Sequence, residues 1–309
     1  MPAHPTRLDS RQPRFCHAHR IAPPPASGGA HFVRAALLVV AVLGTACGAL
    51  ASEHSAAWKR GASLVEAPGK CNACHSPAGA DAPVGTDLHL AGGMADGWEA
   101  PPLNGRSPAP VPWTEDAYYA YLRTGRAPLH GAALGPMRAV VRELAALPAA
   151  DVRAMAHYLA SFSAPLGPQR ERAVVDAAET RARLYHRNDF EDGAHIYAHI
   201  CAPCHDAGPG ALLHVQSSLA LVASVHSSRP DNVLRAMFDG VAGPARADPA
   251  AMPAFTARLD DRQFVQVAAY LRQRFAGEQP PWTDLAAAVA RLRPHDGRAR
   301  GADGVAAPR

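Results

Sequence analysis

The chain has 309 residues, enough for two domains of about 100–150 residues each. Hydrophobic residues make up 48% of it, which excludes a generally disordered protein. Residues 1–51 hold five arginines and one aspartate, so they carry the whole net charge of +4, and the rest of the chain is formally neutral. A neutral body has no broad electrostatic attraction to nucleic acid, so we expect no nucleic-acid partner.

The first 51 residues have the features of a leader. Residues 1–30 are rich in Pro, Gly and Ala and show no helix or strand pattern. Residues 35–51 follow Arg34, carry no charge, and end in the small-residue triplet Ala-Leu-Ala. This order is typical of a secretory signal peptide, and the apolar run is also marginally long enough for an uncleaved membrane anchor. A lipid anchor on Cys47 is the third alternative, and all three would place the rest of the chain outside the cytoplasm.

Two copies of one short motif stand out in the remaining sequence. Residues 71–75 and 201–205 both have the form C-x-x-C-H, the attachment signal for c-type haem. Two thiols three positions apart on a helical turn can add to the two vinyl groups of one porphyrin, and the adjacent histidine can coordinate its iron. The sequence therefore predicts two covalently bound haem c groups. The predicted attachment and axial residues are Cys71, Cys74 and His75 in the first motif, and Cys201, Cys204 and His205 in the second.

A redox dithiol, a zinc site and a pair of disulfides are the alternatives for these cysteines. A zinc site would need four ligands that converge from both motifs. A redox dithiol would not need a histidine directly behind each cysteine pair. The haem interpretation explains both cysteines and the histidine in each copy, and we prefer it.

The segments around the two motifs repeat as well. Each motif follows a short amphipathic segment and precedes two further predicted helices, of which the first ends at a glycine. The predicted segments are 61–65, 115–123 and 147–162 around the first motif, and 193–197, 231–238 and 259–275 around the second. The chain is thus predicted to be all-α, with two similar domains. The expected parts are a leader at 1–51, a first domain at 55–165, a charged and partly helical linker at 166–185, a second domain at 186–293, and a disordered tail at 294–309.

One methionine in each copy is the expected sixth iron ligand. Met252 lies in a proline-containing loop between the middle and last helices, where it can cross the face of the ring opposite His205. Met137 occupies the matching place in the first copy. Its rival in the second copy, Met237, falls inside the predicted middle helix, where a methionine usually fills the core. The other candidates are expected to be structural or surface residues: Met94, Met155, His130, His157 and His226.

Two protein ligands on each iron would leave no open position for oxygen or peroxide. A thioether ligand also favours the ferrous state and raises the reduction potential. The predicted function is therefore electron transfer without substrate chemistry, so the chain is not expected to be an enzyme by itself. A dihaem enzyme of the peroxidase or thiosulfate dehydrogenase type, and a free soluble electron carrier, remain as alternatives.

Further stretches carry a resemblance to a known family. They are residues 97–103, 110–115, 121–125, 135–137, 232–240, 252–253 and 280–285. With both motifs, they make residues 60–293 resemble the cytochrome c subunits of membrane-associated bacterial dehydrogenases. The resemblance includes the subunit paired with molybdenum hydroxylases of the nicotinate dehydrogenase and isoquinoline oxidoreductase type, and the alcohol dehydrogenase cytochrome c subunits.

This resemblance implies two tandem class I cytochrome c domains and a set of partners. A dehydrogenase would donate electrons, and a quinone, an oxidase or another cytochrome would accept them. The chain would work in the periplasm, either soluble or held at the inner membrane through residues 35–51. Many members of the family carry three haem domains, and the two motifs of this chain match the second and third.

Overall fold

The computed structural model describes residues 54–80, 82–185, 190–206, 218–241 and 251–294. These residues all fall within one compact unit, His54–Arg309. The predicted leader at 1–51 and the predicted tail beyond residue 294 fall outside the described residues. Within the described ranges, no helix combines the length and the apolar character that crossing a membrane requires.

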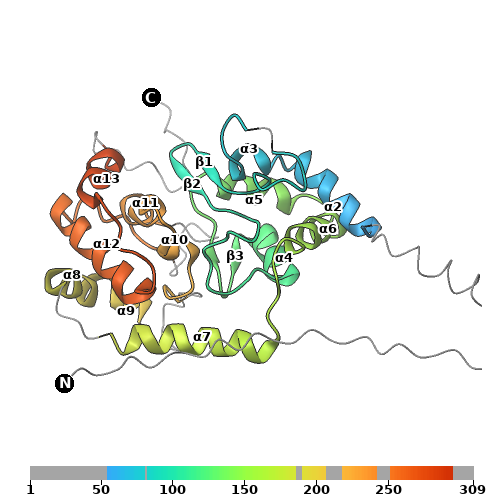
Figure 1. The fold of residues 1–309 in the computed structure, drawn as a ribbon. Coiled ribbons are helices and arrows are strands. Elements are labelled where there is room, and N and C mark those ends of the chain that lie inside the picture. The colour runs from blue at the N-terminus through green and yellow to red at the C-terminus, as the bar shows by residue number, and fades with distance from the viewer. Residues whose placement is uncertain (1–53, 81, 186–189, 207–217, 242–250, 295–309) are drawn as a thin grey trace, which may run out of the picture. The chain divides into compact units, whose positions relative to one another are not determined.

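Helices form most of the regular structure, as predicted, and the described strands make two short antiparallel hairpins (Figure 1). The first half of the chain contains α2 (Ala56–Glu66), α3 (Asn72–His75), β1 (Gly93–Ala95), β2 (Trp98–Ala100), α4 (Glu115–Thr124), β3 (Arg126–Ala127), β4 (Gly131–Ala132), α5 (Met137–Ala145) and α6 (Ala149–Ala160). The second half contains α7 (Pro168–Arg183), α8 (Glu191–Ile196), the π-helix η1 (Tyr197–Cys201), α9 (Ala202–His205), α10 (Ala223–His226), α11 (Asp231–Asp239), α12 (Asp261–Ala276) and α13 (Leu285–Leu292).

The first domain is built on the crossing of α2 and α6. Gly61 lies where the two helices touch, because a Cβ atom there would overlap the carbonyl oxygen of Ala154 and the Cβ of Tyr158. The absence of a side chain at Gly61 lets the two backbones approach closely. Both helices then bury their apolar residues in one core, which also receives Tyr118 and Leu122 from α4.

The second domain repeats this crossing with α8 and α12. A Cβ atom at Gly193 would overlap the carbonyl oxygen of Gln266 and the Cβ of Tyr270. Helix α12 begins with a capping box, in which Asp260 accepts a hydrogen bond from the Gln263 backbone at 2.8 Å and the Gln263 side chain accepts one from the Asp260 backbone at 2.9 Å. A C-x-x-C-H motif follows each glycine-bearing helix, so the same crossing holds both motifs beside the last long helix of their domain.

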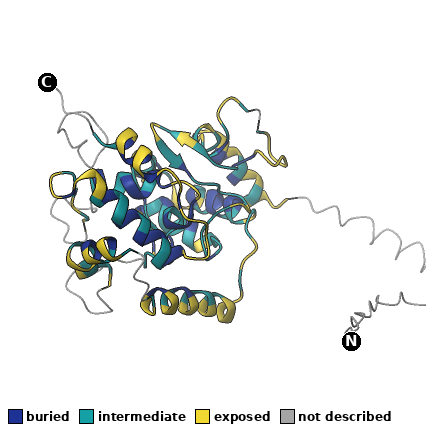
Figure 2. Cartoon of the chain, turned by 60° about the vertical axis from the view of Figure 1, so that its left-hand side comes forward, coloured by how far each residue is buried: buried dark blue, intermediate teal, exposed yellow. Residues whose placement is uncertain are grey.

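The linker predicted at 166–185 carries the long helix α7. Most of this helix is exposed, as the helix at the bottom of Figure 2 shows, and its buried residues are Ala178 and Ala182. The Arg274 side chain of α12 donates a hydrogen bond to the Ala182 carbonyl oxygen at 3.0 Å. The linker helix is thus attached to the second domain along one face.

The β1–β2 hairpin of the first domain docks on α11 of the second. The Asn232 amide accepts a hydrogen bond from the Glu99 backbone at 3.0 Å and donates one to the Glu99 carbonyl oxygen at 2.8 Å. Ser227 donates to the Glu99 carboxylate at 2.7 Å, and Arg235 donates to the Gly97 carbonyl oxygen at 2.7 Å. Val111 of the first domain is 1% exposed within the core of the second. The two domains therefore share part of one core.

We predict that Gly61→Ala destabilises the protein, because the new methyl group would separate α2 from α6. Overpacking of this kind costs about 1–3 kcal/mol. The matched control is Gly105→Ala, where an added Cβ would meet only the Phe162 carbonyl oxygen, at 3.7 Å. Thermal unfolding followed by circular dichroism should show a lower Tm for Gly61→Ala and little change for the control. Equal melting of both variants would contradict the close crossing.

Candidate haem sites

The end of α2 holds the first C-x-x-C-H motif. The Cys71 backbone donates a hydrogen bond to the Val65 carbonyl oxygen at 3.0 Å, and Gly69 donates to the Leu64 carbonyl oxygen at 2.8 Å. Lys70 turns the chain between these bonds with a φ of 47°. The motif then forms the single turn α3, and Cys71 packs against the core of the first domain.

A backbone carbonyl orients the histidine of this first motif. Nδ1 of His75 lies 2.6 Å from the carbonyl oxygen of Pro101, just after β2. A carbonyl oxygen only accepts hydrogen bonds, so Nδ1 carries the proton and donates, and the lone pair remains on Nε2. A metal-binding histidine is typically held in this way, with its second nitrogen free for the metal.

Burial shifts the pKa values of the cysteines and histidines in both motifs. It raises the pKa of Cys71 to about 11 and that of Cys201 to about 12, which keeps both thiols protonated at neutral pH. It lowers the pKa of His75 and of His205, which favours the neutral imidazole that can bind a metal.

Polar contacts stabilise the second motif through the residues before and after it. Helix α8 runs into the π-helix η1, an irregularity that is frequent at functional sites, and α9 follows directly. Tyr197, before the motif, donates a hydrogen bond to Asp206, after it, at 2.8 Å. Arg274 of α12 pairs with the same carboxylate at 2.9 Å. The motif is thus connected at both ends to the helix crossing.

The two histidines differ in their partners. Nδ1 of His205 is buried and has no hydrogen-bond partner among the described residues, whereas Nδ1 of His75 is bound to Pro101. The segment 207–217, which follows His205, lies outside the described residues.

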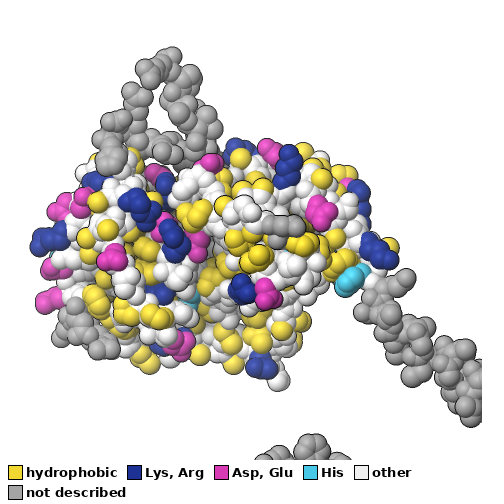
Figure 3. All heavy atoms as spheres, turned by 45° about the horizontal axis from the view of Figure 1, so that its top comes forward, with side chains coloured by type: hydrophobic (Ala, Val, Ile, Leu, Met, Phe, Trp, Pro, Cys, Tyr) yellow, Lys and Arg dark blue, Asp and Glu magenta, His cyan; other side chains and the backbone are white. Residues whose placement is uncertain are grey.

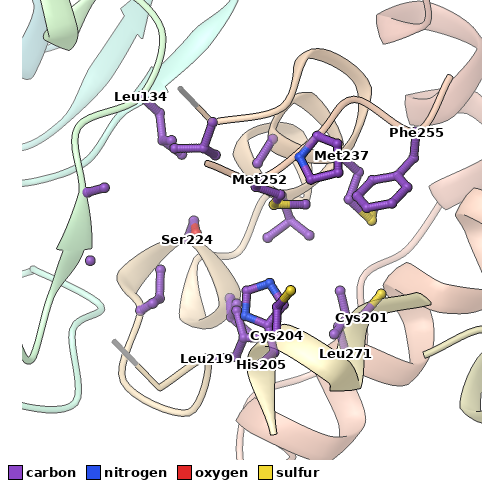
Figure 4. A pocket seen from close by; sticks show the side chains of 18 of the residues that line it. Leu134, Cys201, Cys204, His205, Leu219, Ser224, Met237, Met252, Phe255 and Leu271 are labelled. Atoms are coloured by element: carbon purple, nitrogen blue, oxygen red, sulfur yellow. The ribbon is translucent and has the colours of Figure 1, made fainter. Parts of the chain in front are cut away.

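A cavity of about 260 Å³ adjoins the second motif. Cys201, Cys204 and His205 lie along one side of it, and Met237, Met252 and Phe255 lie on the opposite side (Figure 4). Most of the other described side chains around it are apolar. An apolar slot with an imidazole facing thioether sulfurs suits a porphyrin and its iron, so the residues fit the predicted group.

A short backbone bridge holds Met252 over this cavity. Its backbone donates to the Val241 carbonyl oxygen at 2.9 Å and accepts from the Val241 backbone at 2.8 Å. Helix α11 ends just before, at Gly240, whose φ of 73° turns the chain, and an added Cβ there would overlap the backbone of Met252 and its neighbours. Met252 thus lies in the loop where the sequence predicted it.

Met237 borders the same cavity. It lies in α11, is 4% exposed, and belongs to the core of the second domain, as the sequence predicted. The structure adds that its side chain also lines the cavity beside Met252 (Figure 4). Sequence periodicity places a residue on the buried face of a helix but does not reveal that the buried face borders a cavity.

The place of Met137 differs from its expected loop. It is the first residue of α5, a helix between α4 and α6 that was not predicted from the sequence. Its side chain is half-buried and packs against the core of the first domain, as does Cys71. Gly135, with a φ of 47°, approaches the indole of Trp98 so closely that an added Cβ would overlap the ring. Contact with Trp98 therefore fixes the turn that leads into Met137.

The other histidines and methionines have structural or surface positions. His157 lies 2.9 Å from Glu115, and His226 lies 2.9 Å from the Ala220 carbonyl oxygen. Met155 is fully buried and Met94 is 42% exposed. His130 is buried and stacks on Trp113 with a centroid distance of 3.8 Å.

One further buried histidine, His89, was not predicted from the sequence. It lies 2.8 Å from the Tyr158 hydroxyl and 3.1 Å from the Ala82 carbonyl oxygen. Nothing in the local sequence distinguishes it from a loop histidine, since its side-chain partner, Tyr158, lies 69 residues further along the chain.

Two comparisons with protein families cover both halves of the chain. Residues 58–163 match the family described as cytochrome c, and residues 188–271 match the family described as cytochrome C oxidase, cbb3-type, subunit III. The chain carries two cytochrome c domains. The predicted all-α fold with two tandem domains is thereby confirmed.

Three relatives illustrate the similarity. The chain is 44% identical over 247 residues to a nicotinate dehydrogenase subunit from Pseudomonas putida, a match that covers 79% of this chain and 20% of that protein. It is 32% identical over 246 residues to the alcohol dehydrogenase (quinone) cytochrome c subunit of Gluconobacter oxydans, covering 76% and 51%. It is 32% identical over 257 residues to the gluconate 2-dehydrogenase cytochrome c subunit of Pantoea cypripedii, covering 79% and 57%.

The resemblance seen in the sequence is confirmed by these relatives. All three are named as dehydrogenase subunits, and two of them as cytochrome c subunits. These names agree with the predicted resemblance to the cytochrome c subunits of dehydrogenases. The chain spans one fifth of the length of the first relative and about half the length of the other two.

Proposed function

We propose that this chain transfers electrons through two covalently attached haem c groups, as the cytochrome subunit of a dehydrogenase complex. The observation that carries the proposal is the cavity of the second domain, where a C-x-x-C-H motif faces thioether sulfur across an apolar slot. The same motif on the same helix crossing in the first domain supports a second haem.

Each domain supplies two thiols, one imidazole and one thioether. The thiols would attach the porphyrin, and the imidazole and the thioether would bind its iron. Bound in this way, the haem supplies a one-electron redox centre. The proposed ligands are Cys71, Cys74, His75 and Met137 in the first domain, and Cys201, Cys204, His205 and Met252 in the second.

The side chains that face each other across the cavity favour electron transfer over catalysis. Met252 and Met237 both lie opposite His205, so a thioether is available to close the second axial position. Most of the other described walls are apolar, which disfavours water beside the iron. Both features support a centre that exchanges electrons without binding a small molecule.

The partners are proposed from the relatives. A dehydrogenase, which the resemblance in the sequence implies to be of the molybdenum hydroxylase type, would supply electrons, and a quinone, an oxidase or another cytochrome in the respiratory chain would receive them. Acidic and basic side chains are interspersed over the face shown in Figure 3, so that face carries no large patch of one sign among the described residues. Docking there would depend on shape and apolar contact more than on charge.

We place the chain in the periplasm, soluble or attached to the inner membrane through residues 35–51.

Counting haems tests the proposal directly. The full chain should bind two covalent haems, measured as pyridine haemochrome per polypeptide. Replacing both cysteines of one motif by alanine should leave about one haem, because each motif is sufficient for one attachment. A wild-type chain with one haem, or a pigment that organic solvent extracts, would contradict covalent attachment at both motifs.

Substituting the two methionines that line the cavity of the second domain separates their roles. Met252→Ala should weaken the band at about 695 nm that accompanies thioether ligation of ferric haem, and should lower the potential of one haem. Met237→Leu is the matched control: it keeps an apolar side chain of similar volume and should preserve the band. Loss of the band in Met237→Leu, with its retention in Met252→Ala, would assign the ligand to α11 instead.

Gly135→Ala should disturb the first site from a distance. The added methyl group would strain a residue with a φ of 47° and push against Trp98, which displaces the start of α5 and with it Met137. We expect a weaker band at about 695 nm while both haems stay attached. Trp98→Ala combined with Gly135→Ala removes the obstacle and should restore part of the band. A full-strength band in Gly135→Ala would argue against Met137 as ligand.

A further inference from the structure

The β3–β4 hairpin of the first domain forms a wall of the cavity in the second domain. Arg126 of β3 pairs with Ala132 of β4, and both residues line the cavity. A Cβ atom at Gly131 would lie 3.5 Å from the side chain of Val222, so the hairpin touches the segment that leads into α10. Leu129, in the turn of the hairpin, packs against the core of the second domain. Packing therefore fixes this wall in place.

The charged residues described around this cavity are all arginines. Arg126 and Arg258 line it, and no aspartate or glutamate is among the described residues that do so. Arg126 is half-buried and Arg258 is exposed. Since most of the remaining walls are apolar, a carboxylate entering the cavity would depend on these guanidinium groups for a partner.

The two thiols determine which edge of a bound porphyrin faces the hairpin. Haem c is attached through two adjacent pyrroles, and its two propionate carboxylates lie on the opposite edge of the ring. Cys201 lies at one side of the cavity, and Leu134 and Ser224 lie at the other, beside a strand of the first domain drawn in green (Figure 4). Attachment at Cys201 and Cys204 would therefore direct the propionates toward the hairpin wall.

We infer that Arg126 of the first domain binds a propionate of the haem held by the second domain, so that the first domain completes the second haem site. This inference rests on the proposed covalent haem binding. A guanidinium presents paired N–H donors that match a carboxylate, which makes arginine the suitable cation for such a wall. The second haem would thus lie at the junction of the two domains.

A fixed positive charge beside the haem has a defined effect on its chemistry. It favours the reduced iron, which carries one positive charge fewer, and so raises the reduction potential. It also holds the propionate ionised, so that the potential varies little with pH. Arg126 would act as a positioning residue with an electrostatic influence on the second haem.

Redox titration of the full chain with Arg126→Gln tests this inference. We expect two haems to remain attached, the midpoint potential of the second haem to fall, and that potential to become pH-dependent in the acid range. Arg126→Lys keeps the charge without the paired donors and should give a smaller fall. Arg106→Gln, an exposed arginine that does not line the cavity, is the matched control and should shift nothing. Met252→His identifies the second haem, since it should move only that potential.

Two outcomes would overturn the inference. One is an unchanged potential of the second haem in Arg126→Gln with both haems attached. The other is a shift caused by Arg258→Gln alone, which would place the propionate partner within the second domain. A wild-type chain with fewer than two haems would instead contradict the proposed function, so the two failures are distinguishable.

Discussion

The contact between two helix backbones at a glycine is the constraint on which both sites depend. At Gly61 and at Gly193 the first helix of a domain lies directly against its last long helix, with no room for a side chain between them. The C-x-x-C-H motif begins ten residues after Gly61 and eight residues after Gly193, so the crossing sets its position relative to the core. Backbone bonds to Val65 in the first domain, and the Tyr197–Asp206–Arg274 contacts in the second, extend this constraint to the motif itself.

At the junction of the two domains, residues of the first domain contact the second. The β1–β2 hairpin is bonded to Asn232 through its backbone, and Trp98 of the same hairpin supports the turn before Met137. Leu134, three residues before Met137, lines the cavity of the second domain. Three residues of extended chain span at most about 11 Å, so Met137, the proposed ligand of the first haem, lies close to the cavity of the second domain. The two proposed sites are therefore neighbours in the fold.

Features that depend on local pattern could be predicted from the sequence. The two motifs, the glycine ends of α4 and α11, and the apolar faces of α6 and α12 all depend on nearby residues, and the structure has them where they were predicted. Helix α5 was missed because its short apolar pattern directly follows the Gly-Pro turn at 135–136, which suggested a loop. The hairpin wall formed by Arg126 could not be predicted, because it depends on contact between segments about 100 residues apart in the chain.

We propose that each iron is held between an imidazole and a thioether, which leaves no position for a small molecule. Adding carbon monoxide to the reduced full-length chain tests it most directly. We predict that the absorption spectrum of both haems stays unchanged. Formation of a carbon monoxide adduct by one haem per chain would show an open coordination position. It would contradict a role in electron transfer alone and favour a catalytic role at that site.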